Sequence, residues 1–202
     1  MPTRIRKAEP ADAAAFVSIK KQLPLQTGDG AEGGGFLLGA SEETYRAYIE
    51  HALCLVTETP QGLTGFGIVF PDHMVRSSEL WQKRDEVSWE VNLEPFLTRP
   101  ICYFEQLAFL PGQKLWPSML ALQLAKQAFT QHDLLLTTTV RKPVLNRAAL
   151  PFISRAGGFL AGNIDEHYPE AGQINSDIYL LEKETFVEKM KDHPLWRKVS
   201  GL

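Results

Sequence analysis

Glu105 is the residue whose sequence surroundings best suit acid–base chemistry. It lies in the segment 101–110, which is otherwise almost wholly apolar or aromatic and predicts a central strand covered on both faces. An apolar environment disfavours a charged carboxylate, so the pKa of Glu105 should rise toward working pH, as a general base requires. Side chains alternate along a strand, so Tyr103, Leu107 and Phe109 should share its face. An exposed or salt-bridged glutamate at a strand end is the alternative interpretation.

A tight turn follows this strand and leads into a predicted helix. Pro111 and Gly112 end the strand, and Pro117 suits a first helical position before a helix over 119–129. A helix N-terminus presents unpaired backbone N–H groups and a partial positive charge, so it can hold a pyrophosphate without a dedicated cation. Lys114 would add one positive charge. The turn is therefore predicted to bind phosphate groups.

A second strand and a second helix come next. Residues 134–140 are apolar and β-branched, which predicts a strand. The segment from Asn146 to Gly157-Gly158-Phe159 is typical of a helix that ends at the glycines. Asn146 could hydrogen-bond a bound cofactor or cap the N-terminus of this helix, and the sequence supports both interpretations equally.

These segments together resemble the GNAT superfamily of acyl-CoA-dependent N-acetyltransferases. Leu107-Ala108-Phe109-Leu110-Pro111 and Gln113 match the family's strand and the start of its phosphate loop, and residues 146–159 match its Asn helix and Gly-Phe ending with one extra residue. Two departures stand out. Trp116 and Ser118 replace glycines of the family's loop, and Ile153 or Ser154 replaces the tyrosine that often protonates the departing thiolate.

The resemblance implies a single GNAT-like domain over residues 1–202, of the α/β (α+β) class, with a mixed central β-sheet flanked by helices. It implies acetyl-CoA (coenzyme A) as cofactor and acetyl transfer to a small-molecule or peptide amine by direct attack in a ternary complex. Glu105 would remove the amine proton through water, and Tyr103 or water would protonate the thiolate. The residues implied in cofactor binding are Leu107 and Phe109 through their backbones, Gln113, Lys114, Leu115, Trp116, Ser118 and Asn146. A GNAT-fold module that binds acyl-CoA or a protein partner without turnover is the alternative.

A glycine-rich stretch over 28–35 precedes the apolar triplet Phe36, Leu37 and Leu38. Glycine cannot hold a helix interior well, so the stretch is expected to be a loop. A plain connector is one interpretation. The other is an apolar lid over the acceptor, because its position resembles the substrate loop of GNAT enzymes.

The whole-chain composition is that of an ordinary globular protein of 202 residues and 22.7 kDa. A formal charge of −3 gives no field that would gather nucleic acid or an anionic membrane. Cys54 and Cys102 lie in apolar runs and are expected to be buried thiols, and the five histidines show no metal-ligand spacing, so no metal is predicted. Without an apolar signal region or membrane span, the protein is expected to be cytoplasmic.

The remaining segments complete a mixed sheet. The pattern predicts strands over 3–7, 54–57, 62–70, 159–162 and 176–181, helices starting at 9–12 and after Ser41, and a terminal helix within 182–199. Residues 71–100 form a possible insertion or flap in which 77–84 is predicted to be helical. Its aromatic residues suggest a packed flap, a homodimer surface or an acceptor wall, and the sequence does not choose among them.

Overall fold

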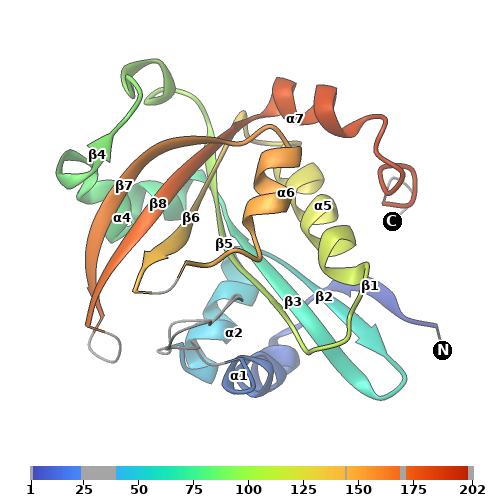
Figure 1. Cartoon of the computed structure of the whole chain (residues 1–202). Coiled ribbons are helices and arrows are strands. Elements are labelled where there is room, and N and C mark those ends of the chain that lie inside the picture. The colour runs from blue at the N-terminus through green and yellow to red at the C-terminus, as the bar shows by residue number, and fades with distance from the viewer. Residues whose placement is uncertain (1, 24–39, 144, 169–171, 200–202) are drawn as a thin grey trace.

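An eight-stranded mixed sheet runs through the centre of the computed structural model, in the order β1-β2-β3-β5-β6-β8-β7-β4 (Figure 1). The structure describes residues 2–23, 40–143, 145–168 and 172–199. The strands are β1 (Arg4–Lys7), β2 (Leu53–Thr59), β3 (Gly62–Phe70), β4 (Ser88–Trp89), β5 (Ile101–Phe109), β6 (Leu134–Lys142), β7 (Phe159–Tyr168) and β8 (Gly172–Glu182). Neighbouring strands are antiparallel except β5 and β6. The predicted fold class is confirmed.

Helices cover both faces of this sheet. On one face lie α5 (Trp116–Ala128), α6 (Leu150–Arg155) and α7 (Lys183–Met190), which pack on alternate side chains of the strands such as Cys102, Leu135 and Leu181. The other face carries α1 (Ala13–Lys21) and α2 (Glu42–His51), which enclose the fully buried rings of Phe16, Tyr45 and Phe66. The Ser41 hydroxyl accepts a hydrogen bond from Thr44 N–H, so the predicted cap of α2 is confirmed.

Strands β5 and β6 separate soon after they begin. They pair only where Ile101–Tyr103 lie beside Leu134–Leu136, and beyond that point they diverge, as Figure 1 shows. At the point of divergence the Thr137 hydroxyl donates a hydrogen bond of 3.0 Å to the carbonyl oxygen of Phe104. Beyond it, no strand in the described part of the chain pairs with the facing edges of β5 and β6.

A β-bulge in β5 lies beside this divergence. Ile68 of β3 pairs with Gln106, and the next residue, Val69, pairs with Phe104, so Glu105 is an extra residue in the strand. The alternation expected from the sequence is therefore broken. Tyr103 packs with the side chains on one face of the sheet, whereas Leu107 and Phe109 pack against α5 on the other. The prediction that all four side chains share one face was wrong, because an extra residue reverses the pleat.

The segment between β3 and β5 packs against the sheet on the face that carries α1 and α2. It contains α3 (Asp72–Ser77), α4 (Glu79–Gln82) and β4, with the buried side chains of Val75, Trp81 and Val87 against the second half of the sheet. Within the range 77–84 predicted to be helical, α-helix covers only α4 and the last residue of α3, because α3 ends at Ser77 and the Ser78 hydroxyl accepts from Trp81 N–H at the start of α4. Gly162 of β7 admits β4 closely: a Cβ there would lie 2.7 Å from the carbonyl oxygen of Ser88.

Arg76 links this segment to the body of the protein. Its guanidinium donates to the Asp72 carboxylate at 2.8 Å and to the carbonyl oxygens of Leu97 and Arg99, each at 3.0 Å. Asp72 in turn accepts from the backbone N–H of Ile101 at the start of β5. A packed flap therefore fits the segment, and its part in an insertion, a dimer surface or an acceptor wall stays a prediction.

The two cysteines are buried and free, as predicted, and burial raises the pKa of the Cys54 thiol to about 12. Among the described residues, none of the helices combines the length and the apolar character needed to cross a membrane. The same residues contain no group of three or more His, Cys, Asp or Glu side chains arranged to hold a metal ion.

Candidate active site

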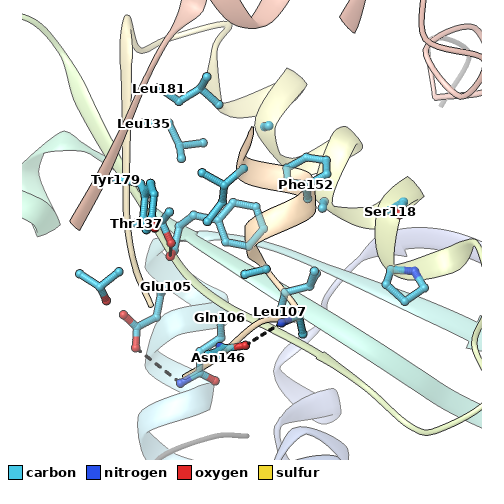
Figure 2. A pocket seen from close by; sticks show the side chains of 18 residues that line it. Glu105, Gln106, Leu107, Ser118, Leu135, Thr137, Asn146, Phe152, Tyr179 and Leu181 are labelled. Carbon is cyan, nitrogen blue, oxygen red and sulfur yellow. Dashed lines mark hydrogen bonds between the residues drawn. The ribbon is translucent and has the colours of Figure 1, made fainter. Parts of the chain in front are cut away.

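A cavity of about 190 Å³ opens where β5 and β6 diverge, between the sheet and helices α5 and α6 (Figure 2). Its walls are mainly apolar, with a few polar groups at the strand ends and at the start of α5. Besides Leu107 of β5, its lining contains the polar residues Glu105, Gln106, Ser118, Thr137, Thr138, Asn146 and Tyr179. Apolar walls with a few oriented polar groups are the usual make-up of a small-molecule site.

Glu105 lies at one side of this cavity, half-buried at the bulge of β5. Burial raises the pKa of its carboxyl to about 7, against smaller opposing effects of the Gln106 amide and Lys20. A carboxyl that titrates near pH 7 exchanges protons readily at neutral pH, which suits a general acid or base. The predicted direction of the pKa shift therefore agrees with the structure.

Gln106 and Tyr45 form a chain of contacts that ends on Glu105. The Tyr45 hydroxyl donates a hydrogen bond of 2.9 Å to Oε1 of Gln106. The Nε2 of Gln106 lies 3.5 Å from Oε1 of Glu105 and donates to it, which Figure 2 marks with a dashed line. Sequence reasoning singled out neither residue, because a glutamine in a strand and a tyrosine in a helix carry no local signal.

The start of α5 forms another wall of the cavity. Gly112, with φ of +89°, makes the turn after β5, and Leu115 occupies the N-cap position of the helix without a side-chain hydrogen bond. Trp116, Pro117 and Ser118 are then its first three residues, so the backbone N–H groups of Trp116 and Ser118 have no carbonyl of the helix to bind. Proline supplies no donor between them. The terminus offers fewer N–H groups to an anion than one without proline.

Asn146 lines the cavity from the loop before α6, together with Glu105 and Leu107 of β5 (Figure 2). Its side-chain oxygen accepts a hydrogen bond of 3.2 Å from the backbone N–H of Ala148. The helix itself begins only at Leu150, after Ala149. Asn146 therefore shapes the approach to α6 without capping it, and the interpretation as the helix cap was wrong.

Two tyrosines lie near the divergence of β5 and β6. The Tyr103 hydroxyl is 2.7 Å from the Thr138 hydroxyl, and Thr138 lines the cavity whereas Tyr103 is not among its described lining residues. Tyr179 of β8 is in register with Thr137 of β6 and does line the cavity (Figure 2). Burial raises the pKa of the Tyr179 phenol, so it stays protonated at neutral pH.

The structure brings together four of the residues that the sequence singled out: Glu105, Leu107, Ser118 and Asn146 line the cavity. Within the described part of the chain, the other cofactor candidates near the turn do not line it; they are Phe109, Gln113, Lys114, Leu115 and Trp116. Phe36, Leu37 and Leu38 lie outside the described residues. The sequence missed Thr137, Thr138 and Tyr179, whose only signal was a hydroxyl within a predicted strand.

The arrangement suits an elongated ligand. Ser118 and Glu105 lie at opposite sides of the cavity in Figure 2, with apolar side chains such as Phe152 between them. A helix N-terminus at one side favours an anionic group, and a carboxyl that titrates near neutrality at the other favours proton transfer. The unpaired edge of β5 offers backbone hydrogen bonds along the way.

Comparison with solved structures shows that the chain has the fold of GNAT acetyltransferases. The ribosomal-protein-S18-alanine N-acetyltransferase of Escherichia coli is similar over 90% of this chain and 94% of its own, with a TM-score of 0.58 and 16% identity. An acetyltransferase of the GNAT family from Streptococcus pneumoniae has a TM-score of 0.55 at 17% identity, over 90% and 99% of the two chains. The yncA protein of Salmonella typhimurium, solved with its cofactor acetyl-CoA, has a TM-score of 0.56 at 15% identity, over 90% and 94%. No protein-family model matches the sequence, and no curated protein does.

Proposed function

We propose that this GNAT-fold chain is an acyl-CoA-dependent N-acyltransferase, most simply an acetyltransferase that acts on a primary amine. The observation that carries the proposal is the Glu105 carboxyl, with a pKa of about 7, at the point where β5 and β6 diverge. A free-thiol assay with acetyl-CoA and a panel of amines tests it. The panel should include small amines and peptides with an N-terminal alanine, since one neighbour acts on an alanine of a ribosomal protein.

Acyl-CoA is a ligand that suits both the cavity and the turn before α5. The N-terminus of α5 would hold its pyrophosphate, with Lys114 close by in the preceding turn. The unpaired edge of β5 beyond the divergence would hydrogen-bond the pantetheine arm through the backbones of Leu107 and Phe109, and Asn146 would border it. The bound cofactor would supply the acyl group as an activated thioester. Gln113, Leu115 and Trp116 would contribute from the turn.

Two proton transfers would accompany the reaction, and residues of the chain would carry them out. As the amine nitrogen bonds to the acyl carbon and the carbon–sulfur bond breaks, the amine loses a proton and the departing thiolate gains one. Glu105, ionised in a substantial fraction of molecules at neutral pH, would take the amine proton directly or through water. Tyr179, which stays protonated in the cavity, is better placed than Tyr103 to give a proton to sulfur.

The first expected result is stabilisation by ligand. CoA at about one hundred times its dissociation constant should add about 2.7 kcal/mol to the free energy of unfolding, seen as a rise in Tm. Ala148→Trp places a large ring in the cavity from an exposed position and should abolish the shift, whereas Ala14→Trp on the exposed side of α1 should retain it. No shift for the native protein at millimolar CoA would contradict the proposed cofactor.

A second expected result concerns Tyr179. Tyr179→Phe removes only the hydroxyl and should lower kcat about tenfold, because the thiolate must then take its proton from water. The KM for acetyl-CoA should change little. Tyr103→Phe is the comparison and should lower kcat less, because Tyr103 is not among the described lining residues of the cavity. An unchanged kcat in Tyr179→Phe would assign the proton to solvent.

A non-catalytic acyl-CoA-binding module is the second candidate function. Trp116 and Ser118 stand where GNAT loops have glycines, and Pro117 removes one N–H donor from the helix start. CoA-dependent stabilisation without thiol release from any amine would favour the module. Thiol release that requires Glu105 would favour the enzyme.

A further inference from the structure

The contact between Glu105 and Gln106 is unusual because these residues are adjacent in one strand. In a regular strand, neighbouring side chains point to opposite faces and cannot touch. The bulge removes this restriction, since Gln106 pairs with Ile68 of β3 and the extra residue Glu105 lies opposite the interval between Ile68 and Val69. The amide of Gln106 can therefore reach the carboxylate of Glu105. The bulge thus brings the Glu105 carboxylate within reach of a hydrogen-bond donor, the amide nitrogen of Gln106.

Tyr45 fixes the orientation of that amide. A glutamine amide can present either its oxygen or its nitrogen to a neighbour, and only the nitrogen donates to a carboxylate. The Tyr45 hydroxyl donates to Oε1 of Gln106, so the amide nitrogen is directed toward Glu105. The Tyr45 ring cannot move away, because it is fully buried and meets Phe16 and Phe66 edge to face, at centroid distances of 5.4 and 5.6 Å.

We propose that Tyr45 and Gln106 are positioning residues for the Glu105 carboxylate, which they hold in one orientation beside the cavity. The inference rests on the proposed role of Glu105 as the proton acceptor. It also couples the site to α2, because Tyr45 belongs to that helix. A ligand-induced displacement of α2 would therefore be transmitted to the base through two hydrogen bonds.

Several charged and titratable groups act on Glu105 from the surrounding elements. Lys20 of α1 favours the ionised carboxylate and Glu166 of β7 opposes it. Burial, and to a lesser degree the charge of Glu105, raises the pKa of Tyr45 and Tyr48 of α2, so both phenols stay neutral. The Gln106 amide favours ionisation as well, because it donates to the charged form. Loss of the Tyr45 hydroxyl frees the amide to rotate, so the carboxylate loses this donor. The pKa of Glu105 should consequently rise further.

The test is Tyr45→Phe, which removes the hydroxyl and keeps the buried ring. The acid limb of the profile of kcat/KM against pH should move upward by about half a pH unit, a modest value because the Gln106 bond is long. At pH 6.5 the rate should fall about threefold, and it should recover at pH 8.5. The KM for acyl-CoA should stay the same. A purely structural role would lower the rate equally at every pH.

Tyr48→Phe is the matched control, since Tyr48 lies on the same helix and no described contact joins its hydroxyl to Gln106. Gln106→Leu should shift the limb at least as far as Tyr45→Phe, and the double variant should shift it no further, because both act through one amide. Equal shifts in the two tyrosine variants, or additive shifts in the double variant, would overturn the proposal.

A direct titration separates this inference from the proposed function. Carbon-13 NMR of labelled glutamate carboxyls, with the Glu105 signal assigned from its loss in Glu105→Gln, measures the pKa in the ligand-free protein. A rise in Tyr45→Phe supports positioning even if no amine is ever acylated. An unchanged or lowered pKa refutes it even if the protein proves to be an active acyltransferase.

Discussion

Glu105→Gln should lower kcat by two to four orders of magnitude near neutral pH, because glutamine keeps the shape of the side chain and cannot accept the amine proton. In the native protein the carboxyl is protonated below its pKa of about 7, so the rate should fall about tenfold per pH unit there and level off above it. The rate of Glu105→Gln should not show this fall below pH 7, because the variant has no carboxyl at this position to protonate. Initial rates of thiol release between pH 5.5 and 9 measure both effects.

The control for this substitution is Glu188→Gln, on the exposed side of α7 and away from the cavity. It should retain native kcat and the native pH profile. Acetyl-CoA should stabilise both variants as it does the native protein, since no charge that binds the cofactor is lost. Native turnover in Glu105→Gln would make Glu105 a structural residue and leave proton removal to water.

The Glu105 carboxyl should also make the free energy of unfolding depend on pH. Because folding raises its pKa from an ordinary value of 4.5 to about 7, the folded state holds the proton more tightly than the unfolded state. The stabilisation this gives is present below pH 4.5 and is lost as pH rises through 7. Glu105→Gln lacks this proton linkage, so relative to the native protein its free energy of unfolding should gain on the order of 3 kcal/mol between pH 4.5 and 8.5 in urea unfolding.

Arg76→Met should destabilise the protein by about 2–4 kcal/mol. Methionine keeps most of the aliphatic bulk but leaves the carbonyl oxygens of Leu97 and Arg99 and the Asp72 carboxylate without their donor. The packing of the guanidinium over Trp81, 5.2 Å from the ring centroid, is lost as well. Urea unfolding at pH 7 measures the change, and tryptophan fluorescence should report a loosened segment 71–100 around Trp81 and Trp89.

Arg46→Met provides a matched comparison. Arg46 pairs at 2.7 Å with Glu42 one turn earlier in α2, and both side chains are half exposed. An exposed pair of this kind contributes about 0.3–0.5 kcal/mol, so the variant should unfold almost like the native protein. Similar losses for the two arginines would mean that Arg76 is an ordinary surface residue and that segment 71–100 is held by its apolar contacts alone.

Much of the fold could be predicted because its elements carry strong local signals. The apolar run of β5, the β-branched run of β6 and the serine before α2 each specify an element through its immediate neighbours. The structure of segment 71–100 could not be predicted in the same way. Its α-helices are only four to six residues long and are stabilised by the long-range hydrogen bonds of Arg76 and by the burial of Trp81.

The site was predictable in its main residue and not in its surroundings. Glu105 stood out as a carboxylate in an apolar run, and that argument holds whichever face of the sheet the side chain takes. The bulge has no sequence signal of its own, because it is visible only in the pairing of β5 with Val69 and Ile68 of β3. Without the bulge, Gln106 would point away from Glu105, so neither Gln106 nor Tyr45 could be identified in advance.

The divergence of β5 and β6 has a consequence for the behaviour of the protein in solution. It leaves two strand edges inside the sheet that no strand of the described residues pairs with, although Asn146 N–H donates to the carbonyl oxygen of Val140 and the Thr137 hydroxyl to that of Phe104. Edges of this kind are templates for pairing with another chain, and proteins normally cover or blunt them. A ligand that lies along β5 would cover one of them. The ligand-free protein should therefore self-associate more readily than the ligand-bound protein, because the bound ligand keeps the edge of β5 from pairing with another chain.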